Sequence, residues 1–293
     1  MTSGLVCVVG SVNLDTLVRL DRLPEVGETL LGQPLGSLPG GKGFNQAVAA
    51  ARSSAPTRFC AQLGDDGAGQ DLRREMLRAG LDVDLHLSEG VPTGSAYIAM
   101  LADSANSIIV SRGANAELTP DAAAAAVEGA SVVLTQLEID PRTAEAALAA
   151  GRRTGARTIL NAAPAEGVTP SLLAVTDLLV VNETEAEALG GIDALLGAGP
   201  DALVVTLGSH GARWLTPGGD DLAVRAFEVD AVDTTGAGDA FCGALAAALA
   251  GGADALSALL RASAAGAVTT TAVGAQTELL TPAAIDRLLV GAA

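Results

Sequence analysis

The sequence has few residues of several kinds that carry recognisable functions. Its 293 positions hold one lysine, two histidines, three cysteines and 2% aromatic residues. The 17 basic residues stand against 34 acidic ones, which gives a net charge of −17. Nucleic acids and anionic membranes attract clustered positive charge, so we expect neither as a partner. Cys7, Cys60 and Cys242 lie far apart in apolar runs, which excludes a disulfide framework and a zinc-spaced cysteine cluster, and two histidines exclude a histidine-rich metal site.

The sequence also shows no targeting signal and no membrane-spanning segment. The N-terminus, MTSGLVCVVGSVN, has no basic segment leading into a signal-like apolar segment. The most apolar late stretch, residues 243–250, is too short to span a bilayer. We therefore expect a cytoplasmic protein with no membrane partner.

What the sequence does contain is a regular alternation of short apolar runs and helical segments. The length suits one α/β domain over residues 1–293. Strands are expected at 5–10, 58–63, 132–135, 158–161, 178–181 and 203–207, and helices at 45–52, 70–79, from 120, from 141, at 183–189, 238–250, 253–271 and from 282. Residues 16–38 and 95–111 suggest β-structure outside the main core. The alternation predicts a mainly parallel sheet covered on both faces, with ligands outside the carboxyl ends of its strands.

The segment DTTGAGDAF, residues 233–241, opens a long helical stretch. Gly236 and Gly238 free the backbone there, so that successive N–H groups and the helix dipole can bind an anion. Asp239 would compete with a bound phosphate unless it acts as a base on a hydroxyl that attacks a phosphoryl group. The alternative is that Asp239 caps the helix and that the glycines form a turn.

The segment PGGKGFNQA, residues 39–47, holds the single lysine, Lys42. A phosphate-binding Walker loop would need Ser or Thr after this lysine, but Gly43 stands there and no buried strand precedes the segment. We interpret it instead as a glycine-lined approach in which backbone amides, Lys42 and Asn45 contact a polyhydroxy ligand. A glycine-rich turn before a helix is the alternative.

Polar groups follow several predicted strands. Asn13 and Asp15 follow the first strand, Glu138 follows 132–135, and Asn182 with Glu185 follows 178–181. The last pair has the spacing of a capping box and also offers oxygen ligands for magnesium and its waters. TLGSHG, residues 206–211, follows 203–207 and is typical of a nucleotide-edge loop. The alternative for Asn13 and Asp15 is an Asx turn, and the alternative for Glu138 is a carboxylate at a helix start. For residues 206–211 the alternative is an ordinary turn.

These segments, in this order, resemble the ribokinase (PfkB) family of sugar kinases. The resemblance extends from VGSVNLD at residues 9–15 to GAQ at 274–276 and includes GGKGFNQA, DTTGAGDAF, NETEAE and TLGSHG, with QLE and GAN (113–115) typical of the ribose-specific members. It implies a three-layer α/β/α sandwich with a mainly parallel central sheet and a small β-sheet lid formed by about residues 13–39 and 94–112. It also implies a homodimer through that lid.

The resemblance further implies ATP-dependent phosphorylation of D-ribose at the 5-hydroxyl. Asp239 would be the base, and the amides of Gly236, Ala237 and Gly238 would form the anion hole. The sugar contacts would come from Asn13, Asp15, Gly40, Gly41, Lys42, Gly43, Asn45, Glu138 and Asp239. ATP would be bound by Asn182, Thr206, Leu207, Gly208, Ser209, His210, Gly211, Gly238 and Ser263, with Glu185 organising Mg²⁺. A K⁺ activator would lie at Asp233, Thr235, Thr269, Ala272, Gly274 and Glu278, although a small hydroxyl residue usually stands in place of Glu278.

Three other functions are weighed beside this one. A related kinase could act on fructose, deoxyribose or adenosine, and a non-catalytic sensor could keep the fold without the base. Retention of Asp239 and Lys42 argues against a sensor. A nicotinamide-dependent dehydrogenase is disfavoured because Gly10-Ser11-Val12-Asn13 follows the first strand in place of GxGxxG.

Overall fold

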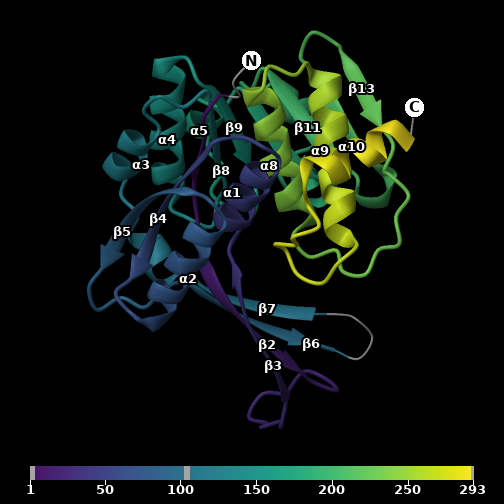
Figure 1. Cartoon of the computed structure of the whole chain (residues 1–293). Coiled ribbons are helices and arrows are strands. Elements are labelled where there is room, and N and C mark those ends of the chain that lie inside the picture. The colour runs from purple at the N-terminus through teal and green to yellow at the C-terminus, as the bar shows by residue number, and fades with distance from the viewer. Residues whose placement is uncertain (1–3, 102–105, 292–293) are drawn as a thin grey trace.

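The computed structural model describes residues 4–101 and 106–291, and its main body is built on a nine-stranded sheet (Figure 1). The strand order is β13-β12-β11-β10-β9-β8-β1-β4-β5. All pairs from β11 to β5 are parallel, and β12 pairs antiparallel with both of its neighbours. The strands are β1 (Val6–Val9), β4 (Thr57–Gly64), β5 (Asp82–Ser88), β8 (Val132–Thr135), β9 (Arg157–Asn161), β10 (Leu178–Asn182), β11 (Ala202–Thr206), β12 (Ala212–Leu215) and β13 (Asp221–Val224).

Helices cover both faces of this sheet, because successive side chains of each buried strand point to opposite faces. Val6 and Val8 belong to one apolar cluster with Phe44 and Phe241, whereas Cys7 and Val9 belong to the other. The first face is covered by α1 (Lys42–Arg52), α2 (Gly67–Arg78), α8 (Ala237–Ala250) and α9 (Ala255–Thr270), and α10 (Pro282–Gly291) packs on α9. The second face is covered by α3 (Pro120–Ala126), α4 (Pro141–Thr154), α5 (Pro170–Ala174), α6 (Glu183–Ala188) and α7 (Ile192–Leu196). The predicted three-layer α/β/α architecture is confirmed.

A second sheet of four strands extends from the main body (Figure 1). Its order is β3-β2-β6-β7, with β2 (Asn13–Arg19), β3 (Gln33–Gly40), β6 (Ser95–Met100) and β7 (Asn106–Ser111). The β2–β6 pair is parallel and the outer pairs are antiparallel. This is the small sheet expected from residues 13–39 and 94–112, of which residues 102–105 lie outside the described part of the chain. We refer to these four strands as the small sheet.

Several short elements were not predicted from the sequence. They are β5, β12, β13, α5 and α7, together with the 3₁₀ turns η1 (Gly113–Glu117) and η2 (Gly208–His210). Strand β12 has only four residues, and β5 lies at an edge where charged side chains alternate with apolar ones. Such patterns carry little of the continuous apolar signal of a buried strand. Among the helices of residues 4–101 and 106–291, none combines the length and apolar character needed to cross a membrane.

Candidate active site

Asp239 lies in the first turn of α8 and is only 8% exposed. Two side-chain amides of α1 donate to its carboxylate: Asn45 Nδ2 to Oδ2 at 3.0 Å and Gln46 Nε2 to Oδ1 at 3.0 Å. The two helices approach closely at Gly243, where a Cβ atom would collide with the carbonyl oxygen of Gln46. The contact between α1 and α8 therefore fixes the orientation of the Asp239 carboxylate.

The backbone at the start of α8 is unusual. Gly236, the N-cap, has φ +75°, and a Cβ atom there would collide with Ala275. Gly238 is helical, and a Cβ atom built on it would meet nothing within 4 Å. Asp239 lies in this first turn, and N–H groups without an intrahelical acceptor at a helix N-terminus bind anions, so the start of α8 is a candidate anion site.

Asn13 and Asp15 enter the site from β2, close to the end of β3. Asn115 Nδ2 donates to Asn13 Oδ1 at 2.8 Å and so positions this amide, whose residue pairs with Gly40 across the two strands. A Cβ atom on Gly40 would collide with the Asp15 carboxylate, so the absence of a side chain makes room for it. The predicted neighbours Asn13, Asp15 and Gly40 are therefore brought together.

Asp15 is a buried carboxyl group surrounded by negative charge. Burial first, and then the charges of Glu138 and Asp239, raise the pKa of Asp15 from 3.8 to about 7. Its Oδ1 atom is buried and has no hydrogen-bond partner among the residues that the structure describes. Buried polar atoms normally have a partner. A ligand rich in hydroxyl donors would supply one here.

Lys42 and Glu138 meet at the N-terminus of α1. The N-cap residue Gly41 has φ +88° and no side chain, and Glu138 Oε2 instead accepts the Lys42 N–H at 3.0 Å. The same oxygen accepts the Ser11 hydroxyl at 2.6 Å. The charge of Asp239 raises the pKa of Lys42 most strongly, against an opposing effect of burial, and Glu138 and Glu185 add to the increase. The single lysine is therefore a partly buried cation among the site's carboxylates.

Gly43 also belongs to this approach of β1 and α1. A Cβ atom on Gly43 would lie 2.6 Å from the backbone of Gly10 and of Ser11. Only glycine allows this contact, through which the start of α1 packs against the residues that follow β1. The segment 39–47 is thus a close backbone approach as well as a turn.

A cavity of about 860 Å³ lies at the start of α8, where Ala237 and Gly238 are among its lining residues. One wall is formed by residues that follow β11, and the other by α8 and α9. Of the residues predicted to bind ATP, the cavity is lined by Thr206, Gly208, Ser209, His210, Gly211, Gly238 and Ser263. Ser263 Oγ is buried and has no partner among the described residues. Leu207 is not one of the lining residues, whereas Phe227 and Phe241 are.

Asn182 and Glu185 form the capping box that their spacing predicts. Glu185 N–H donates to Asn182 Oδ1, and Asn182 N–H donates to Glu185 Oε2, both at 2.8 Å. Burial raises the pKa of Glu185, although the hydrogen bond from Asn182 and the charge of Lys42 oppose this. The contribution of Lys42 shows that Glu185 lies within electrostatic reach of the site. Neither residue lines the cavity.

The residues expected to bind K⁺ lie in the loop before α8, at the end of α9 and in the loop after α9. Thr235 donates to Asp233 Oδ1 through its N–H at 2.9 Å and its hydroxyl at 2.6 Å, and Gly274 N–H donates to Oδ2 at 2.8 Å. Burial opposes these hydrogen bonds, but they lower the pKa of Asp233 overall. Thr269 is buried at the end of α9, and Ala272 follows it. Glu278 is exposed, and its charge acts on Arg52.

Some residues of the site were not singled out from the sequence. Gln46 Nε2 also donates to Asn161 Oδ1 at 3.0 Å, and Gln276 Nε2 donates to Asn45 Oδ1 at 2.9 Å. Asn161 ends β9, so its place after a strand could have revealed it. Gln46 lies inside an alanine-rich helix, where a glutamine usually faces solvent. Only the packing of α1 against α8 shows its role.

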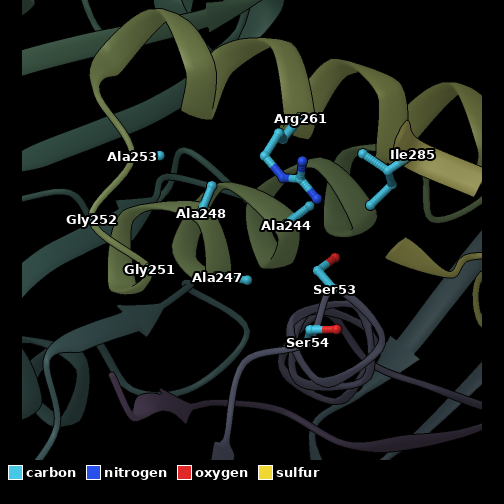
Figure 2. Close-up of a pocket in the computed structure, with 10 residues that line it drawn as sticks. All are labelled: Ser53, Ser54, Ala244, Ala247, Ala248, Gly251, Gly252, Ala253, Arg261 and Ile285. Atoms are coloured by element: carbon cyan, nitrogen blue, oxygen red, sulfur yellow. The ribbon is translucent and has the colours of Figure 1, made fainter. Parts of the chain in front are cut away.

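A second cavity, of about 350 Å³, lies near the opposite end of α8 (Figure 2). It is lined by Ser53, Ser54, Ala244, Ala247, Ala248, Gly251, Gly252, Ala253, Arg261 and Ile285. Its one charged side chain, Arg261, is paired with Asp286 at 2.9 Å. None of the residues predicted from the sequence motifs lines this cavity, so we place the active site at Asp239.

Comparison with known proteins identifies the class that this fold and site define. The chain belongs to the pfkB family of carbohydrate kinases, whose model matches residues 3–282. It is 36% identical to the ribokinase of Bacillus subtilis over 291 residues, which cover 97% of this chain and 99% of the relative. The fold matches a crystal structure of ribokinase from Thermotoga maritima with a TM-score of 0.90 and 30% identity, covering 98% of this chain and 99% of that one. It also matches the structure of Arabidopsis thaliana ribokinase complexed with ribose and ATP, with a TM-score of 0.87, 32% identity and 99% coverage of both chains.

Proposed function

We propose that this carbohydrate kinase transfers the γ-phosphoryl group of ATP to the 5-hydroxyl of D-ribose. The observation that carries the proposal is the position of Asp239. Asn45 and Gln46 donate hydrogen bonds to its carboxylate, Asp15 and Lys42 lie within its electrostatic reach, and the preceding residue, Gly238, lines a cavity that is large enough for a nucleotide. The relatives in the comparison include ribokinases, one of them bound to ribose and ATP.

In the proposed reaction, Asp239 accepts the proton of the attacking hydroxyl. Asn45 and Gln46 hold its carboxylate in one orientation, which is the positioning that phosphoryl transfer requires most. The amides of Gly236 to Asp239 stabilise the negative charge that develops on the transferred group, beside the space left open at Gly238. Lys42 balances the negative charge of the pocket. Asn13, Asp15 and Glu138 bind the sugar hydroxyls.

ATP takes the cavity lined by Thr206, Gly208 to Gly211 and Ser263 in this proposal, with Asn182 paired with Thr206 on the adjacent strand. The carboxylate of Glu185 fits Mg²⁺, a hard cation that prefers oxygen ligands and keeps several waters. When bound, Mg²⁺ would neutralise phosphate charge. The Asp233 carboxylate with backbone carbonyls of Thr269, Ala272 and Gly274 is an all-oxygen donor set that suits K⁺, next to Thr235. Glu278, exposed at the end of this loop, would add a negative charge near it.

The proposal extends to the arrangement of the whole chain. Residues 1–293 form one domain of the family type, and the small sheet acts as a lid over the sugar pocket, since Asn13 and Asp15 lie on its strand β2. Two chains pair through this sheet, which exposes large apolar side chains, among them Tyr97 and Ile109. A cytoplasmic location agrees with a function that consumes ATP.

The substrate is tested by a coupled ADP-release assay across ribose, deoxyribose, fructose and adenosine, with and without K⁺. We expect the highest kcat/KM for ribose and stimulation by K⁺. A clearly higher kcat/KM for another acceptor would replace ribose as the substrate. If no acceptor were phosphorylated while ATP and ribose still bound, the chain would be a sensor and the catalytic assignment would be wrong.

A further inference from the structure

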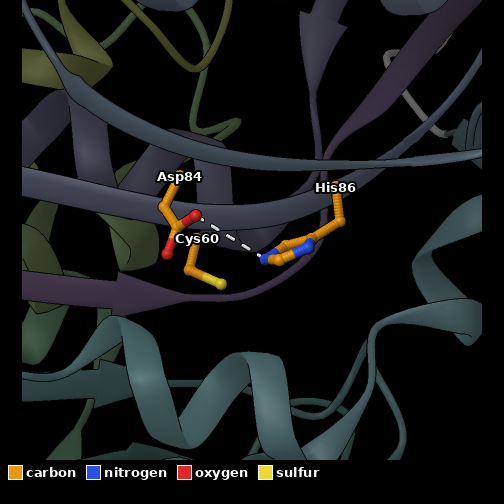
Figure 3. A group of neighbouring side chains, drawn as sticks. All are labelled: Cys60, Asp84 and His86. Atoms are coloured by element: carbon orange, nitrogen blue, oxygen red, sulfur yellow. Dashed lines mark ion pairs between the residues drawn. The ribbon is translucent and has the colours of Figure 1, made fainter.

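The edge of the main sheet carries a polar strip on a face that is otherwise apolar. Parallel pairing of β4 with β5 places Arg58 opposite Asp82, Cys60 opposite Asp84 and Gln62 opposite His86. Side chains of alternate residues share one face of a sheet, so Cys60, Asp84 and His86 all face the same side. Figure 3 shows these three side chains directed toward one another from the two strands.

The ligand atoms of Cys60, Asp84 and His86 lie within 4.8 Å of one another. His86 Nε2 is 3.6 Å from Asp84 Oδ1, too far for a good hydrogen bond. This nitrogen is buried and has no hydrogen-bond partner among the described residues. A solvated sheet edge explains the partial exposure of Asp84 and His86. It does not explain an imidazole nitrogen that is buried, makes no hydrogen bond to the described residues and points toward a thiol and a carboxylate.

We propose that Cys60, Asp84 and His86 form a binding site for a borderline-soft divalent transition-metal ion of the Zn²⁺ class. Sulfur, imidazole nitrogen and carboxylate oxygen are the ligands that Zn²⁺ takes in proteins, with four-coordinate geometry. Three protein ligands leave one position for water. The spacing of the three cysteines in the sequence excluded a zinc-spaced cysteine cluster. This site has a different origin, because the register of two adjacent strands brings residues 60, 84 and 86 together.

The site is accessible to an ion and separate from the active site. The side chains of His86 and Asp84 are 38% and 41% exposed, whereas Cys60 is fully buried behind them. The nearest positive charge on this strip, Arg58, is paired with Asp82 at 2.9 Å, which reduces its repulsion of a cation. When the ion binds, the Cys60 thiol releases its proton to water and the thiolate forms the metal–sulfur bond. The bound ion would join the edge strand β5 to β4.

A titration of the purified full-length protein with Co²⁺ tests this site, because Co²⁺ replaces Zn²⁺ and absorbs visibly. We expect one Co²⁺ per chain, with tetrahedral d–d bands and a sulfur-to-cobalt charge-transfer band, and we expect Zn²⁺ to abolish both. Cys60→Ser should remove the charge-transfer band. His86→Asn and Asp84→Asn, at the partly exposed positions, should each weaken Co²⁺ binding by about tenfold or more.

Cys7→Ser is the matched control, because Cys7 lies on the same face of the adjacent strand β1 but outside the cluster. Cys242→Ser, in α8, is a second control. Both should retain the bands and bind Co²⁺ within about twofold of the wild type. The proposal is overturned if the wild type shows no sulfur-to-cobalt band. It is equally overturned if the band survives in Cys60→Ser, or if His86→Asn and Asp84→Asn bind Co²⁺ as the wild type does.

Discussion

At the residue scale, the site depends on carboxylates held close together. Asp239 is oriented by two amides of α1, while Asp15 faces both Asp239 and Glu138. Lys42 offsets part of this charge, because Asp239, Glu138 and Glu185 all stabilise its protonated form. Burial first, and then these like charges, raise the pKa of Asp15, and its buried Oδ1 atom has no hydrogen-bond partner among the described residues.

The titration of Asp15 should make stability depend on pH. Its pKa is raised in the folded protein to about 7, so the folded chain keeps a proton that the unfolded chain loses near the ordinary value of 3.8. The stabilisation is present at low pH and is lost as the pH rises through about 7. In Asp15→Asn this term disappears. Urea unfolding from about pH 5 to about pH 8 should show the variant gaining stability relative to the wild type as the pH rises.

The same variant provides a check on this interpretation. A difference in unfolding free energy that stays constant over this pH range would contradict the raised pKa of Asp15. Asp121→Asn is a suitable control, because Asp121 is an exposed residue in the first turn of α3. Its effect on stability should not change with pH in this range.

Candidate residues could be selected from the sequence where a motif ties chemistry to position. Asp239 stands at the start of a helix after two glycines, and Lys42 is the single lysine of the chain. Ser11 and Gln46 were not predictable, because a serine after a strand and a glutamine within a helix are common everywhere. Their roles depend on contacts with Glu138 and Asp239 across 127 and 193 positions of sequence.

At the scale of elements, our proposal places the anion site for the transferred phosphoryl group at the N-terminus of α8. Gly236 needs its positive φ, whereas Gly238 has an ordinary helical conformation and open space around it. The fold itself therefore does not require glycine at 238. In our proposal the transferred phosphoryl group requires it.

Gly238→Ala should separate function from stability. The fold can accept the methyl group, and alanine favours a helix over glycine by up to about 1 kcal/mol. We expect an unchanged or higher melting temperature and a fall in kcat/KM for ATP of about tenfold or more, because the methyl group occupies the anion site. Both quantities are measured on the purified variant by thermal unfolding and by the coupled assay.

Two other glycines serve as comparisons for this variant. Gly67→Ala, at an equally open position in α2, should leave activity unchanged. Gly43→Ala should lower stability, because its Cβ would meet the backbone of Gly10 and Ser11. If Gly238→Ala kept full activity, the anion site would not lie at this turn.

Element prediction succeeded where apolar runs were continuous and helices were capped. Strand β8 and the start of α4 at Pro141 were predicted at the observed residues. Strand β5 was missed because Asp82, Asp84 and His86 interrupt its apolar pattern. All three lie on the polar strip at the sheet edge, and two of the residues that hid the strand, Asp84 and His86, are proposed metal ligands.

At the scale of the whole molecule, whose net charge is −17, the arginines and the single lysine occupy different surroundings. Arginines pair with surface carboxylates, as in Arg22 with Glu28, Arg142 with Asp140 and Arg213 with Asp221. The lysine instead lies near the carboxylates of the candidate active site. It is the one basic residue of the chain, among 17, that is not arginine.

The small sheet should hold two chains together in solution. Tyr97 of β6 lies opposite Ile109 of β7, and the two are 55% and 69% exposed. Asp15 pairs with Ala96 in the β2–β6 register, so Tyr97 faces the other side of the small sheet from Asp15. Ile109→Asp should convert a dimer into a monomer in light scattering.

A surface change of the same kind elsewhere controls for this effect. Val290 in α10 is 78% exposed, and Val290→Asp should leave the oligomeric state unchanged. If the wild-type chain were monomeric at the concentrations assayed, the predicted dimer would be wrong. If the dimer persisted in Ile109→Asp, the interface would lie elsewhere.

The role of Asp239 is tested most directly by comparing turnover and sugar binding in Asp239→Asn. The asparagine keeps the size of the side chain but cannot accept the hydroxyl proton. We predict that kcat for ribose falls by about 10²- to 10⁴-fold, the usual contribution of a general base. Ribose binding, measured by calorimetry in the absence of ATP, should remain detectable. Full turnover in Asp239→Asn would contradict the account.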